Sequence, residues 1–239
     1  MPETFLGPKI AIIGGGNLFD LDILQGVDLR EITTPYGKVN YYLIQNHVVI
    51  NRHGPEKNIP PHQIDHRASI SALKRLGVKY VFSFNSVGSL RREIEPGQFV
   101  IPDDYIDFDP VTFFDTELEF ITPGISRKLR RILVEILRKL QMDFHSRGVY
   151  YQTKGPRLET KAEIRMIKNF ATVVGMTMAK EATLATEIGL QYASLCLVDN
   201  FAHGLAKKAL TQQEIKRKQK ESASSLNEII EEILNLELK

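Results

Sequence analysis

The chain has 239 residues, a formal net charge of +2 and a single cysteine. A hydrophobic content of 43% with 25% charged residues is typical of a soluble globular protein that is long enough to bury a substantial core. The near-neutral charge gives no argument for nucleic-acid binding, because the basic clusters fall within helical patterns and are expected on solvated helix faces.

The sequence also lacks the features of a membrane or disulfide-linked protein. No apolar run approaches the roughly 20 residues that a membrane helix needs, and no signal peptide precedes the first strand. Cys196 has no partner for an internal disulfide, which suits a reducing compartment, and its apolar surroundings predict an inert core thiol. We therefore expect a cytoplasmic protein without membrane or nucleic-acid partners.

An apolar strand comes first, and strands then alternate with amphipathic helices. Predicted strands cover residues 9–13, 39–44, 48–50, 78–84, 99–101, 148–153 and 191–198. Predicted helices cover residues 63–76, 125–140, 160–170, 180–188 and 211–238. In the helix at 160–170 the inward residues are expected to be Ala162, Met166, Ile167 and Phe170. The last helix starts at a capping box formed by Thr211 and Glu214.

This alternation predicts an α/β fold in which helices flank a mixed, largely parallel central sheet, with residues 1–239 forming one domain. Ligands of such sheets bind beyond the carboxyl ends of the strands. Five polar or glycine-rich segments follow predicted strands, at residues 14–17, 52–53, 85–86, 176–177 and 199–200. Their joint placement predicts a pocket at this edge of the sheet.

Two further side chains give this pocket a chemical character. Glu159 and Asn200 supply one strong acceptor and one combined donor and acceptor, which together could bind the edge of a flat heterocycle. A purely structural alternative remains open, in which both are ordinary residues at the start of a helix.

The remaining motifs are weaker by themselves. Glycines 14–16 could let backbone amides approach an anion or could form only a tight turn. They do not match the dinucleotide-binding motif G-x-G-x-x-G, because Phe19 stands where the third glycine belongs. Arg52 and His53 suit a bound phosphate, although a surface pair is an equal alternative. The histidines show no convincing metal-ligand spacing, so no metal is expected.

At this point the sequence resembles the trimeric purine nucleoside phosphorylase family, in its methylthioadenosine and methylthioinosine phosphorylase branch. The matching segments run in order along nearly the whole chain: Ile12-Ile13-Gly14-Gly15, Thr34-Pro35-Tyr36-Gly37, Arg52-His53-Gly54, Pro60-Pro61-His62-Gln63, Gly88-Ser89-Leu90, Gly155-Pro156-Arg157 and Val174-Gly175-Met176-Thr177. The resemblance implies a partly closed sheet, a homotrimer or hexamer, and a residue of the neighbouring subunit that completes the 5′ pocket.

The resemblance also implies the reaction and its residues. The reaction is phosphorolysis of a purine nucleoside, with inorganic phosphate as co-substrate and no metal or organic cofactor. Catalysis would fall on Glu159 and Asn200. Phosphate binding would fall on Gly16, Arg52, His53, Ser86 and Thr177. Substrate contacts would fall on Asn85, Leu158, Met176 and Ala202.

Base choice is implied by Glu159, Asn200 and Ala202. Adenosine-type members carry aspartates at the positions of Asn200 and Ala202. Asparagine can donate to O6 of a 6-oxopurine, and Glu159 can accept from its N1–H, whereas adenine has a lone pair at N1. The expected substrate is therefore inosine, guanosine or methylthioinosine. It should be preferred over the adenine analogue by roughly 100-fold or more.

Some positions depart from the family pattern. Gly16 stands where a serine or threonine would give phosphate a hydroxyl, a loss of about 1–2 kcal/mol unless Asn17 replaces it. Lys57 replaces a histidine near the 5′ group, which leaves methylthio and hydroxyl substrates both open. Four alternatives remain: a methylthioadenosine phosphorylase, a nucleoside hydrolase, a binding relative with weakened catalysis, and a dehydrogenase that rests only on the glycine turn.

Overall fold

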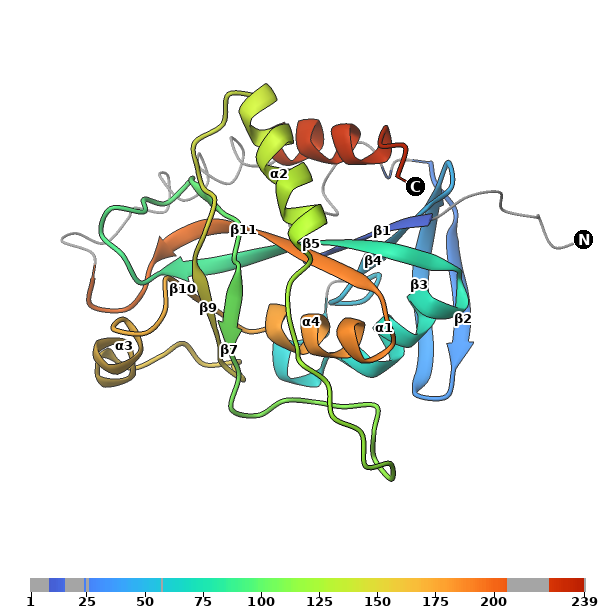
Figure 1. Cartoon of the computed structure of the whole chain (residues 1–239), viewed down its shortest axis with the longest axis horizontal. Helices are drawn as coiled ribbons and strands as arrows, with labels where there is room; N and C mark the ends of the chain where they lie inside the picture. The colour runs from blue at the N-terminus through green and yellow to red at the C-terminus, as the bar shows by residue number, and fades with distance from the viewer. Residues whose placement is uncertain (1–8, 16–23, 25, 57, 206–223, 239) are drawn as a thin grey trace, which may run out of the picture.

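A computed structural model describes residues 9–15, 24, 26–56, 58–205 and 224–238. It shows a twisted mixed sheet with helices packed against both of its faces (Figure 1). The helices are α1 (His66–Arg75), α2 (Arg127–Lys139), α3 (Lys161–Ile167), α4 (Met178–Glu187) and a C-terminal helix at 224–234. The short 3₁₀ helix η3 (Pro61–Gln63) precedes α1.

The strands are β1 (Lys9–Gly14), β2 (Leu29–Thr34), β3 (Gly37–Ile44), β4 (His47–Asn51), β5 (Val78–Ser89), β6 (Phe99–Val100), β7 (Asp104–Ile106), β8 (Phe144–His145), β9 (Val149–Gln152), β10 (Val173–Gly175) and β11 (Gln191–Phe201). Of the ten strand pairings within the described residues, six are parallel. The predicted α/β class with a mixed, largely parallel, helix-flanked sheet is thus confirmed.

Strand β5 is the centre of the sheet and is longer than the sequence pattern predicts. It pairs in parallel with β1 and β11 and in antiparallel with β10. Polar Asn85 and Ser86 end the apolar run that predicted the strand, but pairing with β11 continues through Ser89 and satisfies the backbone there. The polar residues of the pocket are therefore fixed on a strand rather than carried by a loop.

The two larger apolar cores lie on opposite faces of the sheet, and a smaller one lies around α3. Helices α1 and α4 bury residues such as Ile70 and Ala182 in one core. Helix α2 and the C-terminal helix bury residues such as Leu133 and Ile229 in the other. Among the described residues, no helix combines the length and apolar content that crossing a bilayer requires.

Helix α3 differs from its prediction. Its buried side chains are Ile164 and Ile167, whereas Met166 and Phe170 are 57% and 67% exposed and Ala162 is also exposed. The helix begins at a capping box on Thr160 and ends at Ile167, so Phe170 lies beyond its last turn. The predicted inward set was wrong except for Ile167, because the i, i+4 spacing from Ala162 marks the opposite face.

The C-terminal helix also differs at its end. It stops at residue 234 instead of 238, because the chain turns so that Leu236 and Leu238 pack against the core around α2. Residues 211–223, including the predicted capping box, lie outside the described residues.

Candidate active site

A pocket of about 1160 Å³ opens where the carboxyl ends of β1, β4, β10 and β11 meet the later part of β5. Its lining includes every predicted site residue that the structure describes: Arg52, His53, Asn85, Ser86, Leu158, Glu159, Met176, Thr177, Asn200 and Ala202. Gly16 lies outside the described residues, while its neighbour Gly15 lines the pocket. The prediction that these separate segments converge is confirmed.

Arg52 follows β4, is almost fully buried and lines the pocket. Its Nε and Nη2 donate to the two carboxylate oxygens of Glu181, at 2.7 and 3.3 Å. Nη2 also donates to Ser83 Oγ at 2.8 Å, and Nη1 donates to the Phe84 carbonyl at 2.8 Å. Most donors of this guanidinium are therefore bound by protein, and its Nη1 lies on the side of Gly15.

Glu181 lies on α4 and is the acidic centre of this buried network. Its carboxylate also accepts hydrogen bonds from Ser83 Oγ at 2.8 Å and from Tyr192 Oη at 2.9 Å. Burial by itself raises the pKa of Glu181, but the charge and hydrogen bonds of Arg52 outweigh burial and lower the pKa overall. The ion pair consequently stays charged inside the fold.

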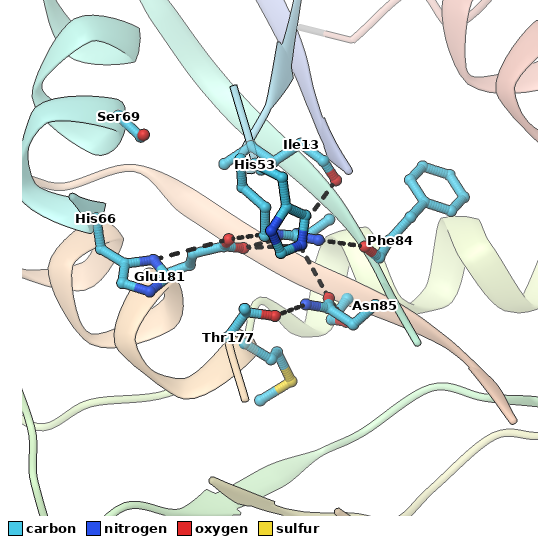
Figure 2. A network of polar contacts seen from close by, with 12 residues as sticks. Ile13, His53, His66, Ser69, Phe84, Asn85, Thr177 and Glu181 are labelled. Atoms are coloured by element: carbon cyan, nitrogen blue, oxygen red, sulfur yellow. Dashed lines mark hydrogen bonds and ion pairs between the residues drawn. The ribbon is translucent and has the colours of Figure 1, made fainter. Parts of the chain in front are cut away.

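Asn85 serves the pocket indirectly. Its Nδ2 donates to Thr177 Oγ1 at 2.8 Å (Figure 2). Its Oδ1 accepts from Ser194 Oγ at 2.7 Å. A donated hydrogen bond occupies a lone pair of Thr177 and leaves its hydroxyl proton available to an anion. Because Asn85 is 3% exposed, its amide orients Thr177 more directly than it meets a ligand.

His53 lies beside Arg52 at the same end of the pocket. Its Nδ1 lies 2.7 Å from the Ile59 carbonyl, which can only accept, so Nδ1 carries the proton. Burial lowers the pKa of His53, which favours the neutral ring near neutral pH. The other ring nitrogen, Nε2, lies on the side of Gly15, as Nη1 of Arg52 does.

Glu159 and Asn200 occupy the other end. Glu159 is 9% exposed, and its Oε1 accepts from Thr153 Oγ1 at 2.8 Å, which fixes the carboxylate. Asn200 is exposed to the pocket and donates from Nδ2 to the Phe201 carbonyl at 2.7 Å. A buried acceptor and an open carboxamide thus face one space.

The loop before Glu159 depends on one glycine. Gly155 has a φ of +66°, and a Cβ on it would lie 2.5 Å from Sδ of Met176, so a side chain is excluded by conformation and by space. This close approach packs the backbone at Gly155 against Met176, three residues before Leu158 in the pocket lining.

Sequence reasoning missed the contacts that Ser83 and Glu181 make with Arg52. A signal for the first was present, because Ser83 and Asn85 are polar residues at i, i+2 within an otherwise apolar strand. They pair in register with Ser194 and Cys196 of β11.

Burial raises the pKa of the Cys196 thiol to about 12, which agrees with the predicted inert thiol. The described residues contain no group of three or more metal-ligand side chains.

The sequence matches the model of a family described as the phosphorylase superfamily over residues 9–235. The chain belongs to the phosphorylase superfamily. It is 46% identical over 229 residues to a probable 6-oxopurine nucleoside phosphorylase of Archaeoglobus fulgidus, covering 93% of this chain and 94% of that protein. It is 40% identical to a probable S-methyl-5′-thioinosine phosphorylase of Methanocaldococcus jannaschii, covering 95% and 92%.

Solved structures of a methylthioadenosine phosphorylase have the same fold. A mutant of the adenosine/methylthioadenosine phosphorylase of Schistosoma mansoni, in complex with methylthioadenosine, superposes with a TM-score of 0.84 at 25% identity. The similarity covers 97% of this chain and 93% of that one.

Proposed function

We propose that this phosphorylase-superfamily chain catalyses phosphorolysis of a 6-oxopurine nucleoside: inosine, guanosine or methylthioinosine. The products are the free purine and ribose 1-phosphate or its 5-methylthio analogue. The observation that carries the proposal is the shared pocket of Glu159 and Asn200 with Arg52, His53 and Thr177. Relatives named 6-oxopurine nucleoside phosphorylase, including that of Pyrococcus furiosus at 38% identity, support the same reaction.

The base is proposed to lie at the end of Glu159 and Asn200. Glu159 accepts from N1–H, while Asn200 donates to O6 and accepts from N7–H of the departing purine. Adenine presents a lone pair at N1, so a buried carboxylate repels it and loses its partner. Leu158, Met176 and Ala202 supply apolar contacts to base and sugar.

Phosphate is proposed to lie at the end of Gly15. Arg52 Nη1, the Thr177 hydroxyl, His53 and Ser86 are its proposed partners, and they hold the nucleophile beside the anomeric carbon. The oxocarbenium-like transition state is then stabilised by the phosphate charge on one side and by the hydrogen-bonded purine on the other.

A nucleoside panel measured with and without phosphate tests the proposal. We expect turnover of inosine, guanosine or methylthioinosine that requires phosphate, at roughly 100-fold higher kcat/KM than for adenosine or methylthioadenosine. Turnover without phosphate would indicate a hydrolase, and binding without turnover would indicate a non-catalytic relative. Either outcome rejects phosphorolysis.

A methylthioadenosine phosphorylase is the second candidate. A relative from Hyperthermus butylicus with that name is 36% identical over 250 residues, and the S. mansoni enzyme has the same fold. Preference for methylthioadenosine in the panel would favour this candidate. Comparison of methylthioinosine with inosine decides the 5′ group, and comparison of inosine with guanosine decides the base.

We further propose that the enzyme is a cytoplasmic homotrimer or hexamer of single-domain chains that works in purine salvage without metal or organic cofactor. The family match to residues 9–235 supports one domain. The segment between β7 and α2 extends away from the sheet (Figure 1) and exposes Phe108, Leu118 and Phe120 by 84% or more. Large exposed apolar side chains on a projecting segment favour contact with another copy.

A further inference from the structure

Strand β11 carries a bulge inside the pocket. Val198 pairs with Val87 and Asn200 pairs with Gly88, so Asp199 is an extra residue in the ladder. Neighbouring residues of a regular strand point to opposite faces, but the bulge redirects the chain, and both Asp199 and Asn200 line the pocket with exposed side chains. A carboxyl group therefore lies directly beside the proposed purine-binding carboxamide.

Asp199 is also linked to the proposed phosphate end. Ser86 lies on β5 opposite Leu197 of β11, and its hydroxyl acts to lower the pKa of the Asp199 carboxyl group. The pocket walls desolvate Asp199 and raise its pKa, and the Ser86 hydroxyl opposes this shift without cancelling it. Asp199 thus holds a proton at higher pH than an ordinary aspartate does, at a point between the two ends of the pocket.

The proposed reaction has to move one proton. A neutral nucleoside and hydrogen phosphate dianion give a sugar phosphate dianion and a neutral purine, so the proton of phosphate ends on the purine. Asn200 has no titratable proton and can only accept from N7–H once that proton has arrived. The pocket therefore needs an acid that can deliver the proton to N7 and be recharged from phosphate.

We propose, on the basis of the proposed function, that Asp199 is a catalytic residue that relays this proton from phosphate to purine. Its O–H bond breaks as N7–H forms, the C1′–N9 bond breaks with its electron pair entering the purine, and a phosphate oxygen bonds to C1′. The Asp199 carboxylate then regains a proton from the phosphate hydroxyl through the Ser86 hydroxyl, which donates one proton and accepts another. No oxidant, reductant or further reactant is needed.

Within the part of the chain that the structure describes, the other charged or titratable side chains that line this pocket are Arg52, His53, Glu159, Lys161, Arg165 and His203. Glu159 is held by Thr153 and is assigned to N1–H of the base. His53 lies beside Gly15, at the phosphate end. Asp199 is the carboxyl group that adjoins Asn200 in the sequence and interacts with Ser86 on the paired strand β5.

The test compares wild type with Asp199→Asn on two substrates. Inosine needs a proton at N7 to leave as a neutral base, whereas 7-methylguanosine carries a methyl group there and leaves without one. Asp199→Asn should lower kcat on inosine by about 100-fold or more and should change kcat on 7-methylguanosine by less than about threefold. A kcat–pH profile on inosine is the second readout: kcat of the wild type should fall as pH rises through the pKa of Asp199, and the variant should lack this limb.

Asp143→Asn is the matched control, because Asp143 is exposed and does not line the pocket. It should behave as wild type on both substrates. Equal losses on both substrates would assign Asp199 to binding or folding, and an unchanged variant with the same pH limb would place the proton elsewhere. Either result overturns the relay. A wild type with no phosphorolysis of either substrate would instead reject the proposed function.

Discussion

Glu181 holds Arg52 at two points, Oε1 to Nε at 2.7 Å and Oε2 to Nη2 at 3.3 Å, in a pair that is almost completely buried. Such a pair fixes the guanidinium before any ligand binds, because neither buried side chain can exchange its partner for water. It also ties the pocket to the fold, since α4 supplies the acid and the residue after β4 supplies the base.

Glu181→Gln removes the charge and keeps the shape. A buried Arg52 without its counter-charge costs about 3–5 kcal/mol, so we expect the free energy of unfolding to fall by that order. The KM for phosphate should also rise, because Arg52 is no longer held in place. Urea unfolding and phosphate titrations of the initial rate measure the two effects.

The control is Glu232→Gln, because Glu232 pairs with Lys139 at 2.6 Å on the surface. Removal of such a pair costs less than about 1 kcal/mol, and the KM for phosphate should not change. If both glutamine variants unfolded with equal ease, the buried pair would not have the structural role assigned to it.

His66 adds an acid-sensitive element next to Glu181. Its ring is buried, neither nitrogen has a hydrogen-bond partner within the described residues, and Nδ1 lies 3.9 Å from Glu181 Oε1 (Figure 2). Burial lowers the pKa of His66 from 6.5 to about 4. Between about pH 6.5 and about pH 4, His66 is protonated in the unfolded chain but neutral in the folded chain. The free energy of unfolding therefore falls as pH falls through this range.

We expect His66→Phe to reduce this acid sensitivity. The proton linkage is worth about 3 kcal/mol between the two ends of that pH range, and the phenylalanine variant should lack this part of the slope. His47 and His53 also have pKa values lowered by burial, so a smaller slope remains. Unfolding free energies measured across the range, with the exposed His62→Phe as control, test this; an unchanged slope contradicts it.

The sequence predicted the sheet, its flanking helices and the convergence of the pocket, because these depend on periodicity and on the rule that strand ends share one edge. It did not predict what each polar side chain bonds to. Arg52 was expected to face phosphate, yet most of its donors bind Glu181, Ser83 and Phe84. Which donors remain for a ligand depends on contacts between residues more than 30 positions apart, and local patterns do not encode them.

Two features failed for more local reasons. The inward face of α3 was wrong because two apolar stripes compete on a short helix, and tertiary contact with Leu90 and Ala202 selects Ile164 and Ile167. The bulge at Asp199 was missed because one extra residue in a strand leaves no mark on hydrophobicity. The pairing register alone brings Asp199 and Asn200 to the same side.

Base selection should depend on the charge of Glu159. Glu159→Gln keeps the acceptor for Thr153 but allows the side chain to donate to the lone pair at N1 of adenine. We expect kcat/KM for inosine to fall and the ratio of inosine to adenosine to drop by about tenfold or more. Steady-state kinetics on both nucleosides measure the ratio, with the exposed Glu228→Gln as control. An unchanged ratio would remove Glu159 from base recognition.

Assembly should depend on the projecting segment between β7 and α2. Leu118 and Phe120 are each 86% exposed. Burying such a side chain against a second copy stabilises the assembly by about 1.5–3 kcal/mol. We expect the double variant Leu118→Ser, Phe120→Ser to raise the dissociation constant by about 100-fold and to shift the mass in analytical ultracentrifugation toward the monomer. Leu29→Ser on the edge strand β2, also an exposed leucine, is the control and should keep the oligomer. A monomeric wild type, or dissociation by Leu29→Ser alone, would show that the projecting segment does not hold the copies together.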